Sequence, residues 1–150
     1  MQLPITGPAD ESDRSYIGDA QGVVPGGGVY DWYRRGLDLL DRGDAAAAAQ
    51  LLEHAAAAEP ESRSVREALA RAQYSSGKFA AARRSFEQIV DANPTDDYAQ
   101  FGLGLASAKT GDYASACEHL SLAVAMRPDN HHYGDALARA RNARTARERA

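Results

Sequence analysis

The residues of this sequence that could do chemistry are few and do not converge. Cys117 and His119 stand two residues apart in a stretch with helical periodicity, so their side chains point to different sides and do not share a metal ion. His131 and His132 are adjacent, whereas zinc needs three or four converging ligands. No nucleophile, base and orienting residue are grouped along the chain, which is the arrangement that catalysis needs. We therefore expect no enzyme activity, no metal site and no cofactor.

Three short motifs suggest other functions but have simpler explanations. Arg42-Gly43-Asp44 looks like an integrin-binding tripeptide, yet glycine followed by a capping aspartate is typical of a turn between two helices. Gly102-x-Gly104 falls inside a helical stretch, and Ser76-Gly77-Lys78 has no upstream glycine, so neither is a phosphate-binding loop.

Composition narrows the class of protein. The chain has 150 residues, of which 44% are hydrophobic and 25% charged, and a formal net charge of −4. These values predict one globular domain and argue against a nucleic-acid partner, which favours a basic surface. The single cysteine fits a reducing compartment. Residues 1–28 do not resemble a secretory signal, and no apolar run approaches the roughly 20 residues that cross a bilayer, so we expect a cytoplasmic protein without a membrane partner.

The elements that position these residues repeat every 34 residues. Each repeat has the apolar spacing of two amphipathic helices joined at a glycine, and the second helix ends before a proline. The markers that share this spacing are Gly43, Gly77 and Gly111, Ala48, Ala82 and Ala116, and Pro60, Pro94 and Pro128.

The repeats define the expected organisation of the chain. Residues 1–28 are rich in turn-forming glycine and proline, and we expect a disordered tail there, with Tyr16-Ile17 and Val23-Val24 as short apolar segments able to dock on the folded part. A folded domain over residues 29–150 follows. It consists of three repeats and a capping helix, at residues 29–62, 63–96, 97–130 and 131–149.

The pattern within each repeat resembles that of the tetratricopeptide-repeat family, a 34-residue helix–turn–helix. The matching residues are Trp32, Gly36, Ala48, Leu52 and Pro60 in the first repeat, Leu69, Ala70, Ala82, Phe86 and Pro94 in the second, and Leu103, Gly104, Ala116, Leu120 and Pro128 in the third. Arg35 departs from the pattern, because an aliphatic residue is usual there. The resemblance implies an all-α fold, a right-handed superhelix of antiparallel helix hairpins (an α-solenoid).

In this family the first helix of each hairpin lines a concave groove. The resemblance therefore implies that the groove holds a partner through Tyr30, Tyr33, Leu37, Glu67, Arg71, Tyr74, Tyr98, Phe101, Leu105 and Arg139. The alternative is that Tyr33, Leu37 and Leu105 belong to the core. Small residues at Gly36, Ala70 and Gly104 should let the two helices of a hairpin approach closely, facing Ala48, Ala82 and Ala116.

The function implied is that of a non-catalytic adaptor, which binds a peptide or helix of another protein in the groove. Some relatives hold a chaperone's terminal carboxylate with a basic clamp, but the matching positions Tyr33, Leu37, Ala68, Tyr98 and Gly102 lack such donors. Two alternatives stay open: a homo-oligomeric assembly module that forms a homodimer, and a regulatory subunit that masks an enzyme.

Overall fold

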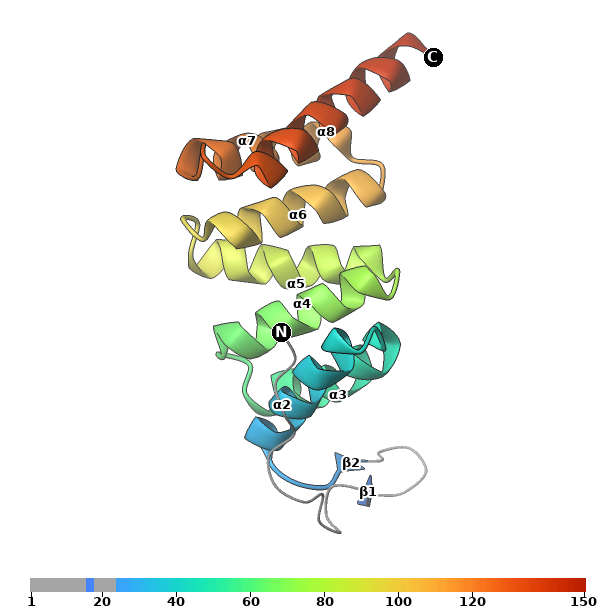
Figure 1. Ribbon diagram of the computed structural model, residues 1–150, viewed down its shortest axis with the longest axis vertical. Helices are drawn as coiled ribbons and strands as arrows, with labels where there is room; N and C mark the ends of the chain where they lie inside the picture. Colours follow the sequence, from blue (N-terminus) through green and yellow to red (C-terminus); the bar gives the residue numbers. More distant parts are fainter. Residues whose placement is uncertain (1–15, 18–23) are drawn as a thin grey trace. The chain divides into compact units, whose positions relative to one another are not determined.

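The computed structural model describes residues 16–17 and 24–150 and divides the chain into two compact units, Met1–Ser76 and Gly77–Ala150. The first contains the two-residue strands β1 (Tyr16–Ile17) and β2 (Val24–Pro25) and helices α2 (Val29–Asp41), α3 (Ala45–Ala58) and α4 (Arg63–Ser75). The second contains α5 (Phe79–Ala92), α6 (Asp97–Lys109), α7 (Tyr113–Met126) and α8 (His131–Arg149) (Figure 1). The predicted all-α fold of helix hairpins is confirmed.

The helices begin and end where local chemistry predicts. Gly43, Gly77 and Gly111 adopt φ values of 84°, 86° and 87°, the left-handed conformation that a glycine accepts without steric cost. At the start of α3 and α7, the side chains of Asp44 and Asp112 accept hydrogen bonds from the backbone N–H groups of Ala47 and Ser115, as helix caps do. The 34-residue spacing of the glycines thus marks the turns.

Each unit has its own apolar core. In the first, Trp32, Leu52 and Leu69 are buried between α2, α3 and α4. In the second, Leu120 and Leu137 pack with buried alanines of α7 and α8. Tyr133, Ala136, Leu137 and Ala140 form the buried face of α8, which covers the hairpin of α6 and α7. The rest of α8 is mostly exposed, as expected of a capping helix.

Small residues bring the two helices of a hairpin together, although the side chain that they meet is a leucine. A Cβ added to Gly36 would lie 2.6 Å from Cγ of Leu52, and one added to Gly104 would lie 2.6 Å from Cγ of Leu120. Gly104 also lies close to the backbone oxygen of Ala116. The same contact therefore closes the α2–α3 and α6–α7 hairpins.

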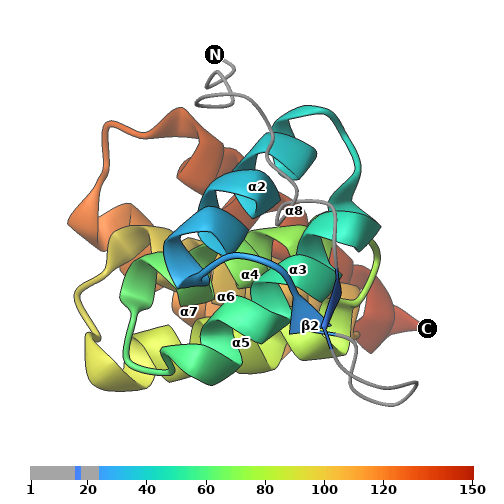
Figure 2. The same ribbon diagram turned by 90° about the horizontal axis from the view of Figure 1, so that it is seen from below.

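The segment before α2 contacts the first hairpin. β2 pairs antiparallel with β1, Tyr16 opposite Pro25 and Ile17 opposite Val24, and it lies beside α3 (Figure 2). Pro25 and Gly26 are buried. Residues 1–15 and 18–23 of the predicted tail, Val23 among them, lie outside the described part of the chain. Among the described helices, none is both long and apolar enough to cross a bilayer.

Candidate functional site

In the first unit, the predicted binding residues lie on α2 and α4, which contact each other. Tyr33 and Leu37 are half-buried and pack at the margin of the core. On α4, Glu67, Arg71 and Tyr74 are also half-buried. None of these side chains is fully covered, so each retains surface that a ligand could contact.

Tyr30 stands apart from this group at the start of α2. Its side chain is 66% exposed, and the Arg34 guanidinium lies 5.8 Å from its ring centroid. Nη1 of Arg34 also donates a hydrogen bond of 3.0 Å to the Tyr30 hydroxyl. The pair gives this end of α2 an exposed aromatic ring held by a cation.

In the second unit, the predicted residues belong to a row of aromatic rings. Tyr98 lies edge-on to the buried Phe86 of α5, with ring centroids 6.3 Å apart. Phe101 follows on α6, 6.2 Å from Tyr98, and stacks on Tyr133 of α8 at 4.7 Å. Such pairs stabilise beyond the area they bury. The row therefore joins α5, α6 and α8 while leaving Tyr98 and Phe101 half-exposed.

Tyr133 is the residue of this row that the sequence pattern did not single out. It is buried, and its hydroxyl donates a hydrogen bond of 2.6 Å to Oδ2 of Asp97. Burial raises the pKa of the Tyr133 phenol above its ordinary value, and the bond to Asp97 adds to the effect. The spacing of Tyr133 from Ala136, Leu137 and Ala140 was the available signal for its packing role.

The remaining predicted residues differ in exposure. Leu105 is half-buried against the core of the second unit, whereas Arg139 is exposed on α8. For Leu105, whose assignment the sequence left open, one part of the side chain packs against the core and another part stays accessible. In the second unit, the partly buried Phe101 and Leu105 can make apolar contacts, and the exposed Arg139 can contact a charged group.

The histidines considered as metal ligands contact other side chains, and the cysteine is buried. Cys117 is buried, and Nδ1 of His119 lies 2.8 Å from Oε1 of Gln100. The rings of His131 and His132 contact each other at 4.1 Å. Within residues 16–17 and 24–150, no group of three or more His, Cys, Asp or Glu side chains is arranged to hold a metal ion.

Arg35, which departs from the repeat pattern, has a structural explanation. Its Nη1 donates a hydrogen bond of 3.3 Å to the backbone oxygen of Gly26, and Nε1 of Trp32 donates one of 3.0 Å to the same oxygen. Both side chains therefore hold the segment before α2 against the first hairpin.

Comparison with known proteins agrees with this architecture. A tetratricopeptide-repeat model matches residues 33–77 and 67–131, so the chain belongs to the tetratricopeptide-repeat family. Repeats of this family generally form non-catalytic scaffolds for protein interaction. No curated protein matches the sequence.

Solved structures share the fold at low sequence identity. MamA AMB-1 is 22% identical with a TM-score of 0.70, over 81% of this chain and 72% of its own. MamA MSR-1 is 22% identical with a TM-score of 0.73, over 88% and 74%. The first tetratricopeptide-repeat domain of human RPAP3 is 18% identical with a TM-score of 0.74, over 81% and 96%.

Proposed function

We propose that this protein is a non-catalytic adaptor that binds a peptide or helix of a partner protein. The observation that carries the proposal is the surface formed by Tyr98, Phe101 and Leu105 on α6, three large apolar side chains that the core covers only in part. Exposed Arg139 on the neighbouring α8 adds charge. Partly covered aromatic and aliphatic groups beside a few polar ones are typical of binding surfaces.

The first unit supports the same function with the half-buried Tyr33 and Leu37 of α2 and with Glu67, Arg71 and Tyr74 of α4. A mixed surface of this kind suits an amphipathic segment, whose apolar side chains supply most of the affinity and whose charges fix its orientation. A cytoplasmic location remains part of the proposal, because a single cysteine fits a reducing compartment.

The test compares two leucines of the second unit. A diazirine analogue of leucine is placed at Leu105, on the proposed surface, or at Leu122 of α7, which is 45% exposed. We expect crosslinking to one partner segment from position 105 and not from position 122. The crosslinked segment, made as a peptide, should bind the purified protein, and Leu105→Gln should weaken this binding while Leu122→Gln leaves it unchanged. Equal crosslinking at both positions would reject the proposed surface.

A second candidate function is assembly into a homodimer, which the exposed Tyr30 at the start of α2 favours. Light scattering over a range of protein concentrations should then show mass that rises with concentration, and Tyr30→Ser should reduce the rise. A strict monomer at all concentrations would exclude this candidate.

A further inference from the structure

A second surface lies away from the aromatic row, where the last two turns of α8 meet the turn between α6 and α7. It is an open pocket of about 540 Å³. The lining residues are Thr110, Gly111, Asp112, Tyr113, Ala114, Arg144, Arg147 and Glu148.

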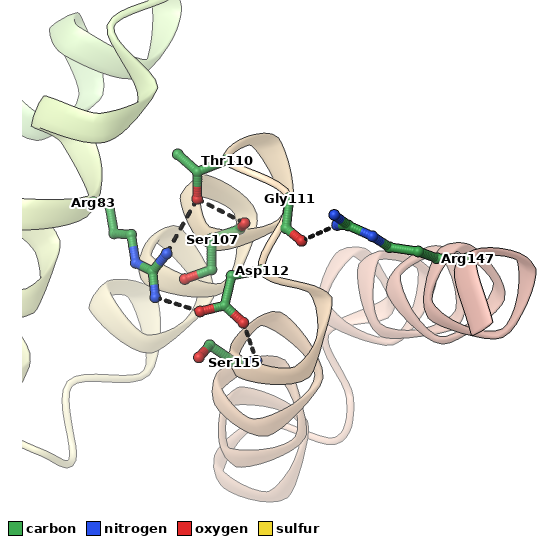
Figure 3. Close-up of polar contacts among 7 residues, drawn as sticks. All are labelled: Arg83, Ser107, Thr110, Gly111, Asp112, Ser115 and Arg147. Atoms are coloured by element: carbon green, nitrogen blue, oxygen red, sulfur yellow. Dashed lines mark hydrogen bonds and ion pairs between the residues drawn. The ribbon is translucent and has the colours of Figure 1, made fainter. Parts of the chain in front are cut away.

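The turn at the base of this pocket accepts two hydrogen bonds from Arg83 of α5 (Figure 3). Nη2 of Arg83 lies 2.8 Å from Oδ2 of Asp112, and Nη1 donates a hydrogen bond of 3.1 Å to Oγ1 of Thr110. Thr110 in turn donates to the backbone oxygen of Ser107. The hydrogen bond from Arg83, together with those from Ser115, lowers the pKa of Asp112 to about 2. The charge of Asp112 is therefore balanced by Arg83, which reduces its repulsion of an anion in the pocket.

Arg147 approaches the same turn from the opposite side (Figure 3). Its Nη1 donates a hydrogen bond to the backbone oxygen of Gly111, and its guanidinium lies 5.7 Å from the Tyr113 ring centroid. Of the three guanidinium nitrogens of Arg147, Nη1 alone donates a hydrogen bond to a described residue. Nε and Nη2 therefore keep N–H donors for a ligand. Because the guanidinium is already held in place without a ligand, less side-chain conformational entropy is lost when a ligand binds.

Arg144 adds a second cation on the same face of α8, three residues before Arg147. Its Nε lies 3.4 Å from Oε2 of Glu148, with both side chains at least half-exposed. An exposed pair of this kind contributes little stability, so a ligand carboxylate can take the place of Glu148 at small cost. Exposed Arg139, Arg141 and Arg149 raise the positive charge of α8 further, against only Asp135 and Glu148.

From this geometry we infer that the pocket binds an acidic peptide segment of another protein. A ligand carboxylate accepts hydrogen bonds from Arg144 and Arg147, and an adjacent apolar side chain packs on Tyr113 and Ala114. The positive charge of Arg144 and Arg147 favours an acidic partner, and a planar guanidinium group can donate two parallel hydrogen bonds to a carboxylate. The site is separate from the aromatic row of the proposed adaptor surface and does not depend on it.

The test measures binding of a fluorescein-labelled peptide of alternating glutamate and leucine to the full chain, by fluorescence anisotropy. Its counterpart with glutamine in place of glutamate is the ligand control. Arg141→Ala is the protein control, because Arg141 is exposed on α8 but does not line the pocket. We expect Arg147→Ala and Arg144→Ala each to weaken binding by about tenfold and Arg141→Ala by less than about twofold. Circular dichroism verifies that each variant is folded.

Three results would overturn the assignment. The glutamine peptide could bind as tightly as the glutamate peptide, or Arg141→Ala could weaken binding as much as Arg147→Ala. A single-stranded polyuridine could also bind more tightly than the acidic peptide, which would make α8 a general basic surface for polyanions. In support, Arg147→Lys should keep only part of the affinity, because lysine retains the charge without the planar pair of donors.

Discussion

The α2–α3 hairpin of the first unit and the α6–α7 hairpin of the second share one building plan but are covered differently. Both are closed by a glycine against a leucine and joined by a left-handed glycine. The first packs against α4 and is also covered by the segment before α2, which is held through two hydrogen bonds to the backbone oxygen of Gly26. The second is covered by the 19-residue helix α8. The residues of the repeat pattern form the hairpin, and residues outside this pattern cover it.

The shared contact predicts the largest effect. Gly36→Ala and Gly104→Ala each force a Cβ against a buried leucine, so each should lower the free energy of unfolding by about 1–3 kcal/mol. Gly134→Ala is the control: an added Cβ there meets no neighbouring atom within 4 Å, and alanine should stabilise α8 by about 0.5–1 kcal/mol. Urea unfolding followed by circular dichroism measures all three. A lower free energy of unfolding for only one of the two glycine variants would show that the two hairpin contacts are not equivalent.

The cover of the second hairpin depends on a hydrogen bond to a charged group. Tyr133→Phe keeps the ring stacked on Phe101 but removes the bond to the Asp97 carboxylate. We expect a loss of about 1.5–3 kcal/mol, the usual range for such bonds. Hydrogen exchange should show faster exchange of the α8 amides. Unchanged exchange in α8 would mean that the bond does not hold this helix.

The segment that covers the first hairpin is held by the neutral Trp32 indole and the Arg35 guanidinium, which donate to the same backbone oxygen. Removal of the neutral donor alone should therefore have a smaller effect. Trp32→Phe removes the indole donor to the backbone oxygen of Gly26, and we expect a loss of about 0.5–1.5 kcal/mol. Amides of residues 26–32 should exchange faster, while those of α8 should not change. Arg35→Ala should produce a similar local change, because Arg35 donates to the same oxygen. A change spread over both units would contradict this local role.

The sequence predicted the hairpins well because their determinants are local and periodic. Gly43, Gly77 and Gly111 mark turns through backbone conformation, and Gly36 and Gly104 mark close helix contacts. The pairing of Tyr133 with Asp97 could not be predicted in this way, because it joins residues 36 positions apart and depends on how α8 packs. The roles of Arg35 and Arg147 were missed for the same reason, since each donates to a backbone oxygen that no side-chain pattern reveals.

The smallest expected effect concerns the turn between α6 and α7, where Asp112 both caps α7 and pairs with Arg83. Asp112→Asn keeps a capping oxygen but removes the charge. We expect the free energy of unfolding to fall by up to about 1 kcal/mol at pH 7, because the pair is partly exposed to solvent.

The pKa of Asp112 falls from 3.8 to about 2 in the folded protein, so the stabilisation by its charge is complete above pH 3.8 and is lost as the pH falls towards 2. Urea unfolding at pH 7, 4 and 2.5 should therefore show the difference between the two proteins shrinking at the lowest pH, and Asp129→Asn, which alters an exposed aspartate outside this turn, should show little change. A difference that persists undiminished at pH 2.5 would assign the effect to the shape of the turn and not to the ion pair.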